Sequence, residues 1–140
     1  PLYQLKACAT ALSLLAEILS LERRGEQPTH YQKIVEKAKF LIESGALHTI
    51  NLSNISEQLN ISTSQLHEIF KTYTSMTPYQ YFIQIKIHKA ETLLEQTDTP
   101  VQEVAYSLGF EDPCYFSRLF KNKTGVTPSQ WKKFLKGEQG

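Results

Sequence analysis

The sequence is poor in the residues that catalysis, metal binding and cross-linking use most. It has two cysteines, Cys8 and Cys114, which lie far apart and belong to no CxxC motif, so neither a disulfide framework nor a structural zinc site is expected. The four histidines form no HExxH pair, and the chain has no glycine-rich phosphate loop and no nucleophile elbow. We therefore predict that the chain is not an enzyme and that it binds no metal and no cofactor.

Long apolar runs are also missing. The most apolar stretch, residues 12–21, is interrupted by Ser13, Glu17 and Ser20, whereas a membrane span needs about 20 apolar residues. The opening residues PLYQLKA lack the basic start of a signal peptide, and the missing initiator methionine suggests a fragment. The length of 140 residues, 41% of them hydrophobic and 21% charged, predicts a globular cytoplasmic protein without membrane contact, with one domain or two small ones.

One segment of the sequence occurs twice, fifty residues apart. The segment HEIFKTYTSMTPYQY begins at His67, and SRLFKNKTGVTPSQW begins at Ser117. The identical positions are Phe70/Phe120, Lys71/Lys121, Thr74/Thr124, Thr77/Thr127, Pro78/Pro128 and Gln80/Gln130. The pairs that keep their character are Ile69/Leu119, Met76/Val126 and Tyr81/Trp131. The chain therefore contains a duplicated structural unit.

Signals for the start of a helix are frequent. A Ser or Thr followed three residues later by Gln predicts a capping box, in which the two side chains satisfy free N–H groups of the first turn. Such pairs are Thr29/Gln32, Ser62/Gln65, Thr77/Gln80, Thr99/Gln102 and Thr127/Gln130. A proline at 78, 100 or 128 follows three of them and suits the first helical turn. Apolar residues then recur at helical spacing and never alternate with period two, which predicts an all-α fold.

Short helices separated by turns of three or four residues are typical of the helix-turn-helix unit. The predicted supporting helix, turn and recognition helix cover residues 53–59, 60–62 and 63–72 in the first copy, and 101–108, 109–112 and 113–123 in the second. A long helix over residues 78–96 connects the two copies. Gly109 falls at a helix end, where a left-handed residue is commonly needed.

The net charge of +1 conceals an uneven distribution. Between residues 113 and 137 there are six basic residues and no acidic one: Arg118, Lys121, Lys123, Lys132, Lys133 and Lys136. Such a surface suits a polyanion, although a solvated basic surface without a partner remains an alternative. A helical adaptor for other proteins is a second alternative, which would not need this acid-free stretch.

The segments ISEQLNISTSQLHEIFKTYTSMTPYQYF and KAETLLEQTDTPVQEVAYSLGFEDPCYFSRLFKNKTGVTPSQW resemble the DNA-binding domain of the AraC/XylS family of bacterial transcription regulators. The resemblance covers residues 31–135. It implies two homeodomain-like helix-turn-helix subdomains, joined by a long central helix, that bind adjacent major-groove segments of double-stranded promoter DNA. It further implies an activator, RNA polymerase as a partner, a nucleoid location, and a small-molecule effector bound by an N-terminal domain that this chain lacks.

Three residues depart from the family's usual sequence. Glu68 stands where the first recognition helix usually has Arg, Ser56 where the first supporting helix usually has Ala, and Lys86 where the central helix usually has Arg. The departure at Glu68 makes the division of affinity between the two subdomains an open question.

Helical spacing also predicts which side chains reach the DNA. With Leu66, Ile69, Phe70 and Tyr73 turned to the core, the DNA-binding candidates of the first recognition helix are Ser62, Ser64, Gln65, His67, Glu68 and Lys71. With Phe116, Leu119 and Phe120 inside, those of the second are Cys114, Tyr115, Ser117, Arg118 and Lys121. Candidate phosphate contacts, besides Lys71 and Lys121, are Thr77, Lys86, Lys123 and Thr127.

Arg118 is the predicted base reader, because a guanidinium group bonds guanine O6 and N7 as a fork. The alternative is a surface ion pair, for instance with Glu111. The aromatic residues Phe110, Phe116, Phe120 and Trp131 are predicted to be core rather than a stacking surface for bases.

The first residues carry an apolar stripe of their own. It consists of Leu5, Cys8, Leu12, Leu15 and Leu19, which predicts a helix that needs a covering partner at a dimer or domain interface. By resemblance, residues 1–28 are the end of an effector or dimerisation domain with its linker. Residues 29–77 are then the first subdomain, 78–96 the connecting helix and 97–140 the second subdomain. The alternative is that residues 1–21 pack on the DNA-binding part of the same chain.

Overall fold

A computed structural model describes residues 10–16, 28–46 and 49–137, and every regular element in these ranges is a helix. The all-α prediction is therefore confirmed. The chain divides into two units, Pro1–Lys33 and Ile34–Gly140. In the first, residues 10–16 are helical, and α2 (His30–Ser44) begins there and ends in the second. Of the residues described, none belongs to a helix that is long and apolar enough to cross a membrane.

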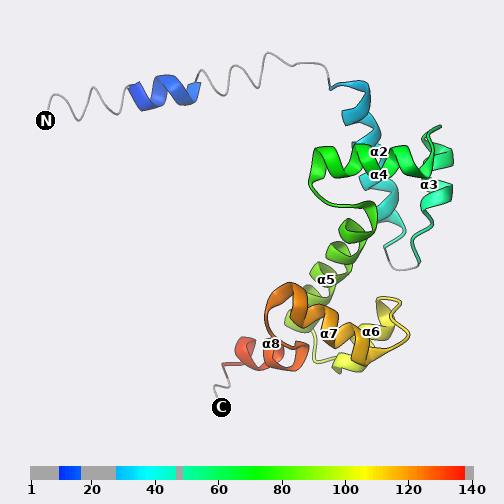
Figure 1. Ribbon diagram of the computed structural model, residues 1–140. Helices are drawn as coiled ribbons and strands as arrows, with labels where there is room; N and C mark the ends of the chain where they lie inside the picture. The colour runs from blue at the N-terminus through cyan, green and yellow to red at the C-terminus, as the bar shows by residue number, and fades with distance from the viewer. Residues whose placement is uncertain (1–9, 17–27, 47–48, 138–140) are drawn as a thin grey trace, which may run out of the picture. The chain divides into compact units, whose positions relative to one another are not determined.

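The second unit contains two groups of three helices that share one long helix. The helices after α2 are α3 (Leu52–Gln58), α4 (Thr63–Thr74), α5 (Pro78–Gln96), α6 (Val101–Ser107), α7 (Pro113–Thr124) and α8 (Pro128–Leu135). Figure 1 shows α5 running from the group of α2, α3 and α4 to the group of α6, α7 and α8. The bounds of α5 are those predicted, and both recognition helices, α4 and α7, extend slightly beyond their predicted ends.

The predicted capping boxes form at four of the five positions. Ser62, Thr77 and Thr127 each cap a helix and exchange hydrogen bonds with the Gln three residues on, and Thr29 does so with Gln32. The box at Thr99 is wrong. Pro100 is the N-cap residue of α6, so Thr99 lies one position before the cap and its hydroxyl is not placed to serve the first turn.

The left-handed backbone conformation occurs at two pairs of equivalent positions in the two copies. The turn between supporting and recognition helix has Asn60 at a φ of 56° in the first copy and Gly109 at 81° in the second. The C-cap of the recognition helix is Ser75, at 61°, and its counterpart is Gly125, at 88°. The prediction for Gly109 is confirmed. The second copy uses glycine at both sites, where this conformation carries no Cβ penalty.

The two groups share a continuous core, to which α5 contributes Phe82, Ile83, Ile87 and Ala90. On the recognition helices, Leu66, Phe70, Phe116 and Phe120 are completely buried. The core prediction for Tyr73 is wrong, because its side chain is 43% exposed. The buried positions of α4 are four residues apart, at 66 and 70, so the next position inward is Thr74, whose hydroxyl donates to the Phe70 carbonyl at 2.7 Å.

The aromatic series of the second copy is core, as predicted. Phe110, Phe116 and Phe120 are buried, and the ring centroids of Phe110 and Phe116 are 5.1 Å apart. Trp131 is half-buried and stands edge-on to Phe120, with ring centroids 5.7 Å apart.

Candidate nucleic-acid interface

The two recognition helices are seated in their subdomains in the same way. Position by position, residues 66–80 and 116–130 have the same sequence of buried, half-buried and exposed side chains. Each helix buries two residues four apart, Leu66 and Phe70 in α4 and Phe116 and Phe120 in α7. The duplication of sequence is therefore a duplication of exposed surface as well, and equivalent positions of α4 and α7 are offered to the solvent.

On α4, most of the predicted DNA contacts are exposed. Ser62, Ser64, Gln65, Glu68 and Lys71 are exposed and His67 is half-buried. The capping box occupies part of this set: Ser62 Oγ accepts from the Gln65 N–H at 3.1 Å, and Gln65 Oε1 accepts from the Ser62 N–H at 3.0 Å. Among these exposed predicted contacts, the charged side chains are Glu68 and Lys71.

On α7, Cys114, Tyr115, Arg118 and Lys121 are exposed and Ser117 is half-buried. The guanidinium group of Arg118 forms no hydrogen bond or ion pair with any residue that the structure describes, so the predicted alternative, a pair with Glu111, is not formed. Tyr115 differs from the others, because its ring packs against Phe110 with centroids 6.3 Å apart. The part of the Tyr115 ring that packs against Phe110 is therefore not available for contact with DNA.

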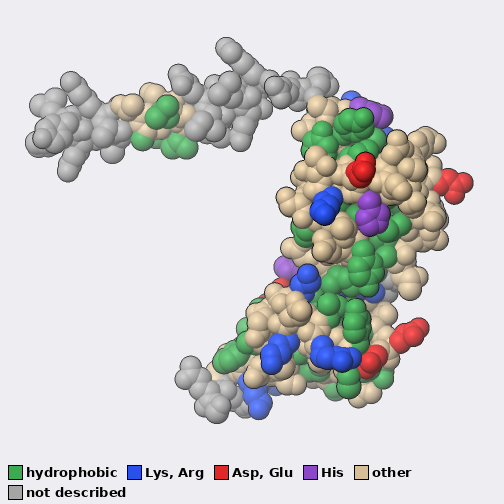
Figure 2. All heavy atoms as spheres, in the orientation of Figure 1, with side chains coloured by type: hydrophobic (Ala, Val, Ile, Leu, Met, Phe, Trp, Pro, Cys, Tyr) green, Lys and Arg blue, Asp and Glu red, His purple; other side chains and the backbone are tan. Residues whose placement is uncertain are grey.

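Part of the positive charge that the sequence predicts for the surface of the second subdomain is used in contacts within the chain. Lys136 Nζ lies 2.8 Å from Asp98 Oδ1, and Lys132 Nζ donates to the Thr99 carbonyl. The hydrogen bond and charge of Lys136 lower the pKa of Asp98. Sequence reasoning did not predict the pairing of Lys136 with Asp98, because Asp98 lies before the acid-free stretch of residues 113–137. Figure 2 shows several Lys and Arg side chains over the part of the surface formed by this subdomain.

The predicted phosphate contact at Lys86 is wrong. The side chain is 4% exposed, and its ammonium nitrogen lies 4.6 Å from the ring centroid of Phe82 and 5.0 Å from that of Phe110. Burial lowers the pKa of Lys86. Helical spacing places Lys86 on the core face of α5, next to Ile83 and Ile87. Its positive charge nevertheless led to the prediction of a phosphate contact.

The other candidate phosphate contacts remain predictions. Lys123 is exposed. The hydroxyls of Thr77 and Thr127 accept from the N–H groups of Gln80 and Gln130, each at 3.2 Å. These hydroxyls therefore serve their own helices.

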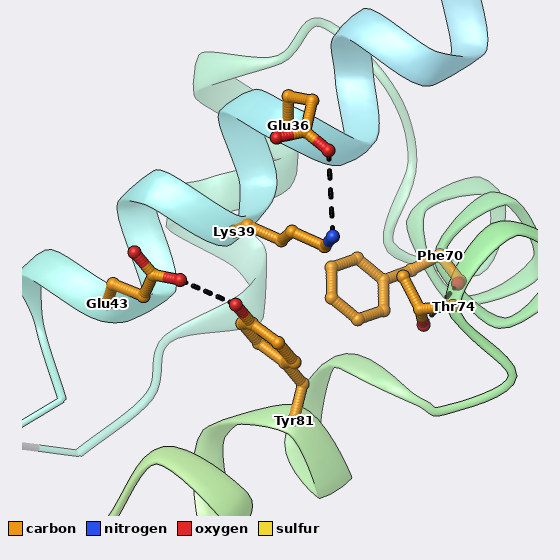
Figure 3. A network of polar contacts seen from close by, with 6 residues as sticks. All are labelled: Glu36, Lys39, Glu43, Phe70, Thr74 and Tyr81. Carbon is orange, nitrogen blue, oxygen red and sulfur yellow. Dashed lines mark hydrogen bonds and ion pairs between the residues drawn. The ribbon is translucent and has the colours of Figure 1, made fainter. Parts of the chain in front are cut away.

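A pair of residues that sequence reasoning missed supports the first recognition helix. Tyr81 Oη donates to Glu43 Oε1 at 2.5 Å, which joins α5 to α2, and the Tyr81 ring stands edge-on to Phe70 with centroids 5.4 Å apart (Figure 3). Burial, and then the hydrogen bond that Tyr81 donates to Glu43, raise the pKa of Tyr81 to about 12. The two residues are 38 positions apart, so no local signal connects them.

The apolar stripe near the start of the chain is only partly described. Leu12 and Leu15 are 66% and 54% exposed. Leu5, Cys8 and Leu19 lie outside the described residues. An interface through this stripe stays a prediction.

Two helix-turn-helix units with matching exposed recognition helices define a DNA-binding domain of the kind that transcription regulators carry. A family model described as a helix-turn-helix domain matches residues 55–133, which is more than half of the chain. The chain belongs to the AraC/XylS family of helix-turn-helix regulators. The matched relatives include transcription activators, and a solved structure that shares the fold is the C-terminal domain of a response regulator.

Two relatives and one solved structure illustrate the similarity. The chain is 30% identical over 122 residues to the Msm operon regulatory protein of Streptococcus mutans, covering 87% of the chain and 44% of that protein. It is 42% identical over 81 residues to the HTH-type transcriptional activator RhaR of an Enterobacter species, covering 58% of the chain and 29% of that protein. The chain thus spans less than half the length of these relatives.

The solved structure is the C-terminal domain of AraT, a response regulator from Geobacillus stearothermophilus. It superposes with a TM-score of 0.68 at 29% sequence identity, covering 72% of this chain and 84% of that one.

Proposed function

We propose that this domain binds promoter DNA sequence-specifically, with α4 and α7 in adjacent segments of the major groove. The observation that carries the proposal is the matching seating of the two recognition helices, which offers equivalent faces of α4 and α7 to the solvent. An α-helix fits the major groove and reads base edges there.

The connecting helix has a suitable length for this arrangement. The 19 residues of α5 span about 28 Å at 1.5 Å per residue, and successive major-groove segments on one face of DNA are about 34 Å apart. A modest bend of the duplex, or an offset of the subdomains, closes the difference. One copy of the domain then reads about two helical turns.

The two recognition helices should read different bases. Glu68 and Arg118 occupy equivalent exposed positions and carry opposite charges. An arginine pairs with guanine O6 and N7, whereas a glutamate accepts from cytosine N4 and repels phosphate. Arg118 is therefore the main base reader, and Lys71 and Lys121 hold the phosphate backbone on either side. We expect an asymmetric site in which the α7 half contributes more of the affinity.

The proposal extends to the organisation of the chain and to its role in transcription. Residues 1–28 form the end of an effector or dimerisation domain, and residues 29–77, 78–96 and 97–140 are the first subdomain, connecting helix and second subdomain. The RhaR relative is named as an activator, which favours activation and contact with RNA polymerase here. An effector would bind the preceding domain, and Leu12 and Leu15 supply part of a dimer interface.

The experiment is selection from a randomised duplex pool at two salt concentrations, followed by sequencing. We expect two half-elements about 10 base pairs apart, and affinity that falls steeply with salt. Arg118→Ala should relax one position, at a cost of about 1–3 kcal/mol of discrimination. Lys37→Ala is the matched control, because it removes one positive charge from an exposed position of α2, outside both recognition helices.

Three outcomes would count against the proposal. Salt-sensitive binding without an enriched motif would reduce the domain to a general polyanion binder. Unchanged discrimination in Arg118→Ala would remove Arg118 as the reader. No binding at any salt concentration would favour the protein-adaptor alternative.

A further inference from the structure

A cavity of about 440 Å³ lies where the two subdomains meet on α5. Thr49 and Ile50 line it from the segment before α3, Tyr79 and Lys86 from α5, and Phe110 and Tyr115 from the second subdomain. Pockets for small molecules typically have volumes of about 300–1,000 Å³ and combine an apolar lining with a few polar groups. Of the side chains of α7 that are predicted to contact DNA, Tyr115 lines the cavity, and the others do not.

The polar group that distinguishes the cavity is the ammonium of Lys86. The side chain is 4% exposed, and no residue that the structure describes gives it an ion pair or a hydrogen bond. It is held by the faces of Phe82 and Phe110. A buried charge without a counterion is costly, and cation–π contacts leave the N–H donors of the ammonium unused. The depressed pKa of Lys86, caused by burial, reflects that cost.

The walls beside Lys86 are aromatic. The rings of Tyr79 and Phe82 have centroids 6.2 Å apart, and those of Phe110 and Tyr115 are 6.3 Å apart. Tyr79 and Tyr115 both line the cavity, and burial, followed by the neighbouring phenol of Tyr115, raises the pKa of Tyr79. A flat apolar group is the kind of molecule that such walls accommodate.

Two carboxylates also line the cavity, and they restrict where a negative charge can sit. Glu111 and Asp112 are both exposed, so they lie toward the solvent and water screens their charge. Asp112 Oδ1 also accepts from the Cys114 N–H at 2.9 Å as the cap of α7. An anionic group is therefore favoured at the Lys86 end and disfavoured at the mouth.

We propose that this cavity binds a small aromatic carboxylate, with the carboxylate on Lys86 Nζ and the ring between the aromatic side chains. Such a molecule supplies the counterion that Lys86 lacks. Because the cavity is lined by residues of both subdomains, its occupant also stiffens the junction between them.

The test is calorimetric titration of the whole 140-residue chain, without DNA, with three probes that share one ring. The probes are phenylacetate, the neutral phenylacetamide and the cationic 2-phenylethylamine. We expect phenylacetate to bind at least ten-fold more tightly than the other two. In amide spectra, phenylacetate should shift the signals of Gly109 and Phe110 before others.

Substitutions at Lys86 then identify the anion site. Lys86→Met should abolish the preference for phenylacetate, and Lys86→Arg should keep it. Lys89→Met is the matched control, since it makes the same change on the same helix at a position that does not line the cavity. Thermal denaturation checks that each variant folds, and Lys86→Met should melt no lower than the wild type, because a buried unpaired ammonium is removed.

Several results would overturn the proposal. They are binding of none of the probes, equal affinity for phenylacetate and phenylacetamide, and a preference that survives in Lys86→Met. Tighter binding of the amine would instead assign the cavity to Glu111 and Asp112.

Discussion

Exchanging the residues at the ends of the two recognition helices should change stability in opposite directions. Ser75 and Gly125 are equivalent C-cap residues, and both are left-handed, with φ of 61° and 88°. Their N–H groups donate to the carbonyls of Lys71 and Lys121 at 2.9 and 2.8 Å. Both residues therefore make the same C-cap hydrogen bond from the left-handed region, at φ and ψ of 61° and 10° for Ser75 and of 88° and −13° for Gly125, and only Ser75 carries a Cβ. The perturbations are Ser75→Gly and Gly125→Ser.

The magnitude follows from the conformation alone. A left-handed residue with a Cβ costs about 1–2 kcal/mol. Glycine removes that cost but loses about 0.5–1 kcal/mol more conformational entropy on folding. Ser75→Gly should therefore stabilise the domain by about 1 kcal/mol, and Gly125→Ser should destabilise it by a similar amount. No atom lies within 4 Å of a Cβ added at Gly125, so the second change carries no additional clash.

Thermal and urea denaturation measure both changes. A change of 1 kcal/mol shifts the melting temperature of a domain of this size by about 4 °C. The double variant should return close to the wild-type stability, because independent changes add. A lower melting temperature for Ser75→Gly, or shifts of the same sign for both single variants, would refute the conformational argument.

Three further predictions concern single side chains. Tyr81→Phe should destabilise the domain by about 1 kcal/mol below pH 10. The folded-state pKa of Tyr81 is raised to about 12, so its contribution is present below pH 10 and is lost as the pH rises toward 12. Urea denaturation of wild type and Tyr81→Phe across this range should show the difference vanish, and a constant difference would contradict the pKa argument. Thr127→Ala removes the cap bonded to Gln130 and should cost about 1 kcal/mol in the same assay, with no change if the box contributes nothing. Ser56→Ala should change stability by less than about 0.5 kcal/mol, because the buried hydroxyl donates only to the Ser53 carbonyl of its own helix; a larger loss would indicate another role.

Much of the fold could be predicted because its signals are local. A capping box joins residues three positions apart, and the buried stripe of a helix repeats every three or four residues, so both can be found without knowing what the helix packs against. The bounds of α5, the cap at Ser62 and the left-handed Gly109 follow from such signals. The comparison of the duplicated segments added the equivalence of Glu68 and Arg118.

The predictions that were wrong, for the core position of Tyr73 and the capping box at Thr99, have a common physical origin. Periodicity allows spacings of three or four residues, so Tyr73 was assigned to the core, whereas the buried positions of α4 are four apart and the next inward residue is Thr74. A proline after a Thr does not determine which residue is the N-cap, and at Pro100 the helix begins one position later than the Thr99 motif indicates.

By itself, therefore, the sequence determined the helices, their caps, the duplication and the two faces that α4 and α7 turn to the solvent. Only the tertiary structure decided the interactions between distant residues: the bond of Tyr81 to Glu43, the pairing of Lys136 with Asp98, and the burial of Lys86 between Phe82 and Phe110. Each depends on how one helix is placed against another. That placement is set by the packing of the whole core, and no short stretch of sequence encodes it.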